Sequence, residues 1–237
     1  PLTEGETVVK LLCMRDIADK FLVLVTKLGT IKKTTLKAFA KIRCTGIRAI
    51  SLDEEDELAF CNISSGSDSI VLATRDGQGI HFKEEEVRSM GRQAAGVRGI
   101  RLKEDDIVVG MEVIIDTTHD LLFATSRGYG KRVSVTDFRV AHRGGVGVRT
   151  IPVDKRNGVV IGLELVSEFS NILLIDTNGK MMRLSPSEIR TMRRHAKGVR
   201  LIRLDKGQIL SSVVAFDEDE TSDDEFVEET SVEETEE

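Results

Sequence analysis

One phrase recurs in this chain about every fifty residues, and it constrains the fold more than any other feature. Each copy begins with a glycine, an apolar residue and an arginine; the glycines are Gly46, Gly96, Gly147 and Gly198, spaced 50, 51 and 51 residues apart. A second set keeps nearly the same period: Gly29, Gly77, Gly128 and Gly179. Repeats of this length indicate an array in which each unit buries its apolar face against its neighbours.

Within each repeat the pattern is that of β-strands. Short apolar runs at 21–25, 70–73, 121–124 and 172–175 are bounded by turn residues, which is typical of strands buried on both faces. A glycine of the second set ends the turn that follows each run. Asp76-Gly77 and Asn178-Gly179 predict two-residue hairpin loops with positive φ at both positions. An apolar residue then follows ten positions after each turn glycine, at Phe39, Val87, Phe138 and Ile189.

These signals predict about four short strands per repeat, which is one blade of an all-β, propeller-like array. We expect one domain over residues 1–216, with repeats at about 3–52, 53–102, 103–153 and 154–204 and a closing strand at 205–216. Residues 187–196 are expected to form a short helical turn. No stretch of eighteen apolar residues exists, so no membrane partner is expected.

The net charge of −6 combines two opposite parts of the chain. Residues 217–237 contain 13 acidic residues and no Lys or Arg, so this tail is expected to be disordered. The remainder has 34 basic and 27 acidic residues, a net charge of +7. A basic body with an acidic tail indicates a polyanion-binding protein that carries its own competitor.

The basic residues recur at fixed places in the repeats. One set follows the turn glycines by four positions, and another fills the loop before each Gly-x-Arg strand. Such a pattern predicts a positive track around the perimeter that suits a bent phosphate backbone; the alternative is a solvated face balanced by nearby acids. The candidate DNA-binding residues are Lys32, Lys33, Lys41, Arg43, Arg88, Arg92, Lys131, Arg132, Arg139, Arg143, Arg183, Arg190, Arg193, Arg194 and Lys197.

The arginines of the Gly-x-Arg strands, Arg48, Arg98, Arg149 and Arg200, are in phase with the apolar residues behind them if the strands alternate. This predicts buried arginines that pair with acids where blades meet, with DNA contact as the alternative.

No catalytic constellation is found in the sequence. Tyr129 is the single tyrosine and has no base or metal motif near it, so we interpret it as an exposed turn aromatic that could touch DNA. The four histidines have no metal-ligand spacing. Cys13, Cys44 and Cys61 are expected to be buried thiols in a reducing compartment.

These blades, basic loops and the acidic tail resemble the C-terminal DNA-wrapping domain of the DNA gyrase A subunit. The phrases that carry the resemblance are 29–33 (GTIKK), 95–102 (AGVRGIRL) and 128–132 (GYGKR). The resemblance covers residues 1–216 and implies a six-bladed β-pinwheel whose blades exchange strands and whose basic rim wraps DNA. The family's Q-R-R-G-G-K-G box has its nearest match at 141–147, which keeps Arg143 and three glycines but lacks two basic positions. The first blades are therefore expected to lie outside this chain.

The resemblance implies a non-catalytic part of an ATP-dependent type II topoisomerase that supports negative supercoiling. Its partners would be double-stranded DNA, the rest of the gyrase A subunit and the gyrase B subunit, and the two subunits would form an A2B2 assembly. This chain would bind no cofactor itself, since ATP and Mg would lie on other domains or subunits, and the setting would be the bacterial cytoplasm at the nucleoid. The alternatives are the A-type subunit of topoisomerase IV, whose repeats are generally more degenerate, and a protein-interaction propeller.

Overall fold

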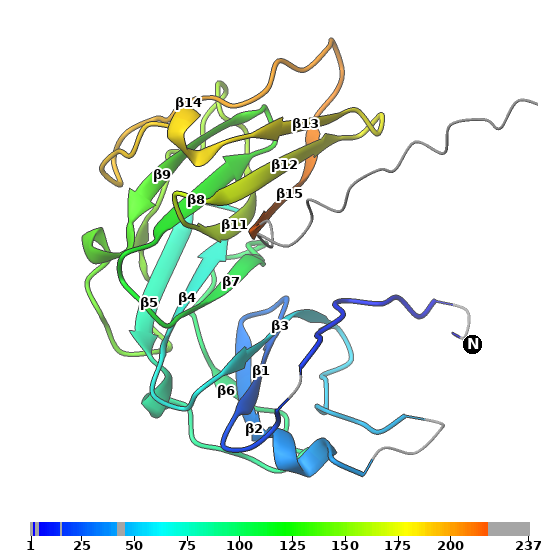
Figure 1. Ribbon diagram of the computed structural model, residues 1–237. Helices are drawn as coiled ribbons and strands as arrows, with labels where there is room; N and C mark the ends of the chain where they lie inside the picture. The colour runs from blue at the N-terminus through cyan, green and yellow to red at the C-terminus, as the bar shows by residue number, and fades with distance from the viewer. Residues whose placement is uncertain (1, 3–4, 15, 42–45, 218–237) are drawn as a thin grey trace, which may run out of the picture.

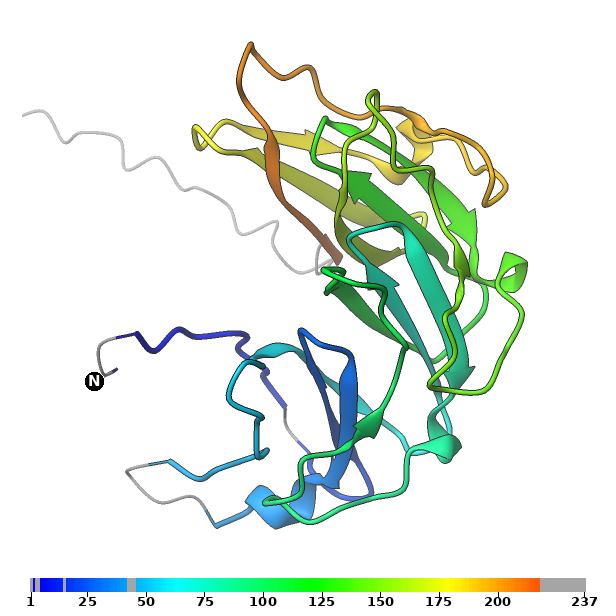
Figure 2. The same cartoon turned by 180° about the vertical axis from the view of Figure 1, so that it is seen from behind.

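The computed structural model of the protein describes residues 2, 5–14, 16–41 and 46–217. It is all-β, as predicted, and its sheets follow one another around a curved array that opens on one side (Figure 1). The view from behind shows the same arc (Figure 2). Of the predicted acidic tail, Asp217 is the last residue of a strand, and residues 218–237 lie outside the described part.

Each sheet, or blade, is built on a hairpin. The hairpins are β1 (Phe21–Thr26) with β2 (Thr30–Thr35), β4 (Ser69–Thr74) with β5 (Gln78–Lys83), β8 (Asp120–Thr125) with β9 (Tyr129–Ser134), and β12 (Ser170–Asp176) with β13 (Met181–Leu184). The first strand of each hairpin contains one of the predicted apolar runs, and Val23, Leu72, Phe123 and Ile172 within them are fully buried. The predicted central strands are confirmed.

Each blade is completed by strands from later in the chain. Inner strands pair with the first hairpin strand and are β3 (Leu58–Ser64), β7 (Val108–Ile114), β11 (Val160–Val166) and β15 (Leu210–Asp217). Outer strands pair with the second hairpin strand in blades 1–3 and are β6 (Val97–Arg98), β10 (Val148–Arg149) and β14 (Val199–Arg200). In the described part of the chain, blade 4 has three strands.

The outer strands of blades 1–3 come from the following repeat, so the Gly-x-Arg phrases that begin at Gly96, Gly147 and Gly198 each belong to the blade before them. The predicted repeats at 53–102 and 103–153 therefore do not coincide with blades, although the strand exchange matches what the resemblance implies. Four blades are described, where the resemblance implies six. The predicted closing strand is the inner strand of blade 4.

Hairpin loops and helical turns differ in detail from the sequence expectation. The first three loops have three residues, as at 27–29, and only the glycine has a positive φ, which is +77° at Gly77. Such a loop needs left-handed backbone at one position, so the prediction of two-residue loops is wrong. Each second strand runs into a short 3-10 helix: η1 (Leu36–Phe39), η2 (Glu84–Glu86), η3 (Val135–Asp137) and η4 (Pro186–Glu188). The helical turn expected at 187–196 is limited to η4.

The hydrophobic core lies between successive blades. One cluster joins blades 1 and 2, a second joins blades 2 and 3, and a third joins blades 3 and 4. Inner strands pack closely, because a Cβ at Gly110 of β7 would overlap Leu163 of β11. Cys61 is buried in a smaller cluster at blade 1, whereas Cys13 is exposed, which corrects the expectation of buried thiols for that residue.

Candidate nucleic-acid interface

Three connections run along the outer edges of the blades, and we call them the rim loops: residues 88–96, 139–147 and 190–198. Each leaves a 3-10 helix and returns to the outer strand of the preceding blade. On the way it forms a single parallel bridge to the second hairpin strand of that blade, as Ser89 does with Lys33. The fold thus places the basic loops on the perimeter, as predicted.

The first residue of every rim loop is an exposed arginine. Arg88, Arg139 and Arg190 each follow the buried residue that caps a 3-10 helix, so they occupy equivalent places on successive blades. Arg193 of the third loop is exposed as well. Within the described part of the chain, none of these four arginines is in an ion pair. Their charges are available to a ligand.

A second group of rim arginines is half-buried and holds backbone. The Nε of Arg143 donates to Glu86 O at 2.9 Å and its Nη1 donates to Arg98 O at 3.0 Å. Arg194 repeats this arrangement one blade later, on the carbonyls of Asp137 and Arg149, at 2.9 and 3.3 Å. Arg92 is also half-buried. Arg143 and Arg194 thus fasten their rim loops to the helix and strand beneath them.

Lys32 and Lys131 lie beneath the rim and are completely buried. Lys131 Nζ donates to the carbonyls of Arg193, Arg194 and Ala196 at 3.0, 2.5 and 2.8 Å, and Lys32 Nζ donates to those of Ala49 and Arg92. Burial lowers the pKa of both lysines, that of Lys131 to about 8. The expectation that these two lysines lie on the surface is wrong, because a rim loop folds over them.

Lys33 and Arg132 also point inward, to the next blade. Lys33 Nζ lies 3.2 Å from the buried carboxylate of Glu84 and donates to its carbonyl. The Nε of Arg132 donates to Ile189 O at 2.7 Å, and its Nη1 lies 3.6 Å from Asp120. The expected exposure of these two residues is also corrected, because the next blade covers Lys33 and partly covers Arg132. Both join blades rather than line the rim.

Of the other predicted site residues, three are exposed and one lies outside the described part of the chain. Lys41 is exposed, and Arg43 lies outside the described residues. Lys197 is exposed with its Nζ 3.1 Å from Asp154, and Arg183 is exposed with its Nε donating to Asn171 at 2.8 Å.

The Gly-x-Arg arginines contradict the prediction. Arg48, Arg98, Arg149 and Arg200 are all exposed, while the preceding residues Val97, Val148 and Val199 pack inward. The outer strands of blades 1–3 are only two residues long, and the chain turns inward after the arginine, so strand alternation does not extend to the next apolar residue. These side chains add to the outer surface.

Arg156 is not among the residues predicted from the sequence. Its guanidinium carbon lies 4.4 Å from the ring centre of Tyr129, which is in β9 on the outer side of blade 3. The signal was visible, because Lys155-Arg156 stands where two other repeats have acidic turns, Asp53-Glu-Glu-Asp56 and Glu104-Asp-Asp106.

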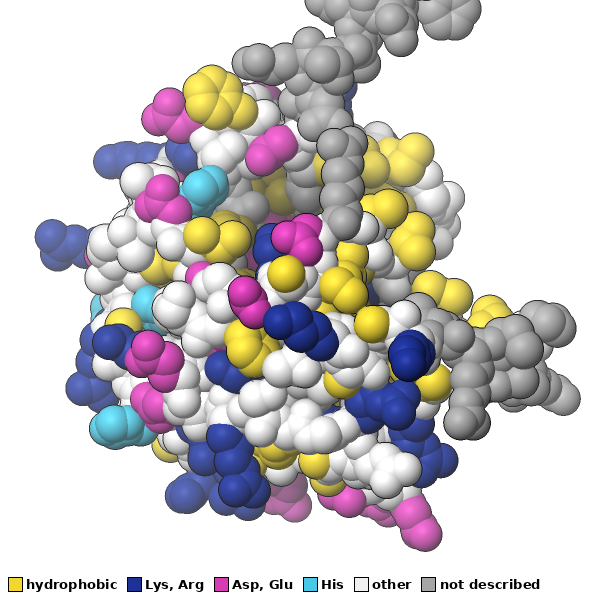
Figure 3. All heavy atoms as spheres, turned by 60° about the horizontal axis from the view of Figure 1, so that its bottom comes forward, with side chains coloured by type: hydrophobic (Ala, Val, Ile, Leu, Met, Phe, Trp, Pro, Cys, Tyr) yellow, Lys and Arg dark blue, Asp and Glu magenta, His cyan; other side chains and the backbone are white. Residues whose placement is uncertain are grey.

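Acidic groups gather on the inner strands. Burial and the nearby charge of Glu164 raise the pKa of Glu112 to about 8, and burial raises the pKa of Glu164 to about 7. Glu164 accepts a hydrogen bond from Ala215 N, on the inner strand of the next blade, at 3.2 Å. The space-filling view shows Lys and Arg side chains mostly around the margin of one face (Figure 3). With pKa values of about 8 and 7, these two inner-strand carboxyl groups largely keep their protons near neutral pH, whereas exposed arginines lie on the rim loops around them.

Among the described residues, no three His, Cys, Asp or Glu side chains are grouped as metal ligands would be. The helices of the described part are single 3-10 turns, none of them long and apolar enough to cross a membrane.

A family model matches this chain to the DNA gyrase C-terminal domain, and curated relatives match it to DNA gyrase A subunits. The family model described as "DNA gyrase C-terminal domain, beta-propeller" matches residues 20–65, 68–115, 119–167 and 171–217. The DNA gyrase A subunit of Chlamydia pneumoniae is 40% identical over 223 residues, which is 93% of this chain and 27% of that protein. The DNA gyrase A subunit of Staphylococcus aureus is 37% identical over 230 residues, or 94% of this chain and 26% of that protein. The chain thus spans about a quarter of the length of these relatives.

Two solved structures share the fold. The C-terminal domain of a DNA topoisomerase IV superposes with a TM-score of 0.85 at 27% identity, covering 92% of this chain and 68% of that one. A DNA gyrase A C-terminal domain superposes with a TM-score of 0.81 at 27% identity, covering 91% and 72%.

Proposed function

The chain belongs to the family of DNA gyrase C-terminal domains, and from this membership and the charge of its rim we propose that it binds double-stranded DNA around its perimeter. The observation that carries the proposal is the recurrence of Arg88, Arg139 and Arg190. These arginines are exposed, have no ion pair in the described part of the chain, and lie at equivalent places on successive blades. A duplex that follows the rim meets one such charge per blade, so it bends as it is bound.

In this proposal the domain wraps DNA for a type II topoisomerase, in which the gyrase B subunit, together with the rest of the gyrase A subunit, cleaves DNA and uses ATP. Wrapping presents a crossed DNA segment to those parts and supports negative supercoiling. The domain itself has no catalytic step and needs no cofactor. Its place is with DNA in the bacterial cytoplasm. Gyrase is favoured over topoisomerase IV by the 40% and 37% identities to gyrase A subunits.

The test measures affinity for a linear duplex at several salt concentrations, with a matched set of variants. Replacing Arg88, Arg139 and Arg190 together by Gln should lower the slope of log affinity against log salt by about three units, near one per lost phosphate contact. The control replaces Lys20, Lys103 and Lys206 by Gln, which removes the same charge at exposed positions outside the rim loops.

Equal slopes in the two triple variants would contradict rim binding. Wrapping itself is read on a relaxed circular plasmid that is nicked and resealed with the domain bound. A changed linking number is expected for the parent and a smaller change for the rim variant. An unchanged linking number despite tight binding would favour a DNA-binding module that does not wrap.

A further inference from the structure

The arginine of each outer strand faces a different partner in each blade. The strand register places Arg98 opposite Thr30, Arg149 opposite Gln78 and Arg200 opposite Tyr129. Only in blade 3 is that partner aromatic. Arg200 Nη2 donates to Tyr129 Oη at 2.9 Å, and the Arg200 guanidinium lies 5.4 Å from the ring centre.

A second guanidinium reaches the same ring from a different loop. Arg156 belongs to the loop that enters the inner strand β11, and its Nη2 donates to Gly198 O at 3.3 Å. Asp154 fixes that loop by accepting the backbone N–H of Arg156 and of Asn157 at 2.9 and 3.0 Å. The Asn157 amide in turn donates to Lys197 O at 3.0 Å. Hydrogen bonds within this turn and to Lys197 thus hold the backbone of Arg156 in place.

No carboxylate neutralises this pair. In the described part of the chain neither Arg156 nor Arg200 is in an ion pair, and the near acid, Asp154, is engaged by Lys197. Hydrogen bonds from Arg200 and then from Arg156 lower the pKa of Tyr129. Two guanidinium charges held on one ring repel each other, and an anion between them would relieve that repulsion. A planar guanidinium fork also suits the two free oxygens of a phosphate.

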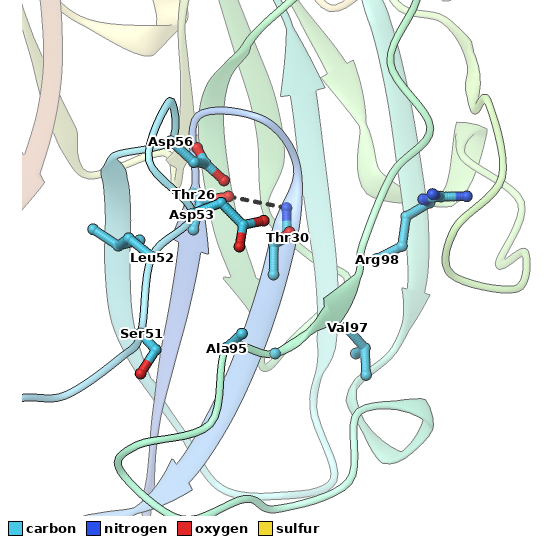
Figure 4. Close-up of a pocket in the computed structure, with 10 residues that line it drawn as sticks. Thr26, Thr30, Ser51, Leu52, Asp53, Asp56, Ala95, Val97 and Arg98 are labelled. Carbon is cyan, nitrogen blue, oxygen red and sulfur yellow. Dashed lines mark hydrogen bonds between the residues drawn. The ribbon is translucent and has the colours of Figure 1, made fainter.

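The same corner of blade 1 has the opposite character. There a cavity of about 230 Å³ is lined by Thr30, Arg98, Asp53 and Asp56, among others. The side chains of Asp53 and Asp56 lie near Thr30, whereas that of Arg98 extends away from them (Figure 4). Two carboxylates at this position would repel a phosphate, so blade 1 provides a natural contrast within one chain.

We propose that Arg156, Arg200 and the Tyr129 hydroxyl form a phosphate-binding site on blade 3 that holds one backbone phosphodiester of duplex DNA. The inference rests on the proposed function and adds a contact that the rim arginines do not supply. The two guanidinium groups donate to the non-bridging oxygens, and Tyr129 Oη donates a further hydrogen bond. Because blade 1 has acids at this corner, the duplex approaches the corner at blade 3 but not at blade 1.

The experiment compares Arg156→Gln and Arg200→Gln with Arg98→Gln on the same linear duplex. Each blade 3 variant should lower the salt slope by about one unit and weaken binding about tenfold at 0.1 M salt. Arg98→Gln, the equivalent position in blade 1, should leave both unchanged. Arg156→Lys should restore the slope, and thermal melts verify that every variant is folded.

A direct readout uses the composition, because Tyr129 is the only tyrosine and the chain has no tryptophan. With ring-labelled tyrosine, the NMR spectrum has one set of ring signals, which should shift when the duplex is added to the parent but not to the Arg156→Gln/Arg200→Gln double variant.

The outcomes separate this site from the proposed function. If Arg190→Gln lowers the salt slope while Arg156→Gln and Arg200→Gln do not, the cluster only packs blade 3, and this inference fails alone. If the parent binds the duplex without salt dependence, the proposed function fails with it.

Discussion

Lys131 and Arg193 are joined by a hydrogen bond, yet they represent two different populations of charge. Lys131 is completely buried, and its ammonium group donates hydrogen bonds to backbone carbonyls, one of which belongs to Arg193. Arg193 is exposed and has no ion pair in the described part of the protein. Interior charges join blades and loops, and rim charges remain available to a ligand. Recurrence of a basic residue in the repeats therefore does not by itself show which of these roles the residue has.

Substitution should cost most stability at the buried ion pair between blades 1 and 2. Glu84 accepts from Lys33, from the Ser64 hydroxyl at 2.6 Å, and from the backbone N–H groups of Gly66 and Asp68. Replacing Glu84 by Ala leaves a buried ammonium without its partner, which should cost about 4 kcal/mol of unfolding free energy. Chemical denaturation measures this loss.

The neighbouring exposed Glu85 provides the control, and Glu85→Ala should change stability by less than about 0.5 kcal/mol. Glu84→Gln keeps part of the hydrogen-bond network and should fall between the two. If Glu84→Ala and Glu85→Ala have the same unfolding free energy, the buried Lys33–Glu84 pair does not hold blades 1 and 2 together.

The second effect is dependent on pH and concerns the inner strands. The folded pKa of Glu112 is raised from 4.5 to about 8, so the fold holds this proton more tightly than the unfolded chain does. That contribution is fully present below pH 4.5 and is lost as the pH rises toward 8. Glu112→Gln cannot ionise, so it should be more stable than the parent by up to about 4 kcal/mol at pH 8 and nearly equal to it at pH 4.5.

Melting temperatures at the two pH values measure this difference. The exposed Glu104 serves as the control, because Glu104→Gln should follow the parent at both values. A Glu112→Gln protein that melts with the parent at pH 8 would show that the inner carboxylates are not strained by burial.

A smaller effect should distinguish Lys131 from Arg193. Lys131→Met places at this position the residue that blade 4 has at the equivalent Met182, and removes the donor to three rim carbonyls. It should cost about 1 kcal/mol of stability and loosen the rim loop, which lowers DNA affinity indirectly. Arg193→Gln should lower DNA affinity with a stability change below about 0.5 kcal/mol.

Paired melts and DNA titrations test this, and hydrogen exchange of the loop at 190–198 should accelerate in Lys131→Met alone. If both variants lost DNA affinity while the melting temperature and the hydrogen exchange of the loop stayed unchanged, Lys131 would have the same role as Arg193, and the distinction between buried and rim charges would be wrong.

The repeat and the apolar runs were sufficient to predict the blades. Leu72 and Phe123 lie in runs whose burial follows from composition and length alone. The burial of Lys131 could not be predicted in this way, because it arises from a loop some sixty residues later that folds over it. Arg200 was misplaced because alternation was extended beyond a two-residue strand. Arg156 was predictable in principle, as a basic residue in a turn that is acidic elsewhere.

The exchange of outer strands has a consequence for how the chain folds during synthesis. Blade 1 begins with a hairpin at residue 21 but receives its last strand at residues 97–98, after the hairpin of blade 2 has been made. A nascent chain therefore always exposes one unfinished edge, which the next stretch to emerge from the ribosome must cover. Since each closure joins residues far apart in sequence, we expect slow folding and unfolding that spreads across neighbouring blades rather than stopping at one.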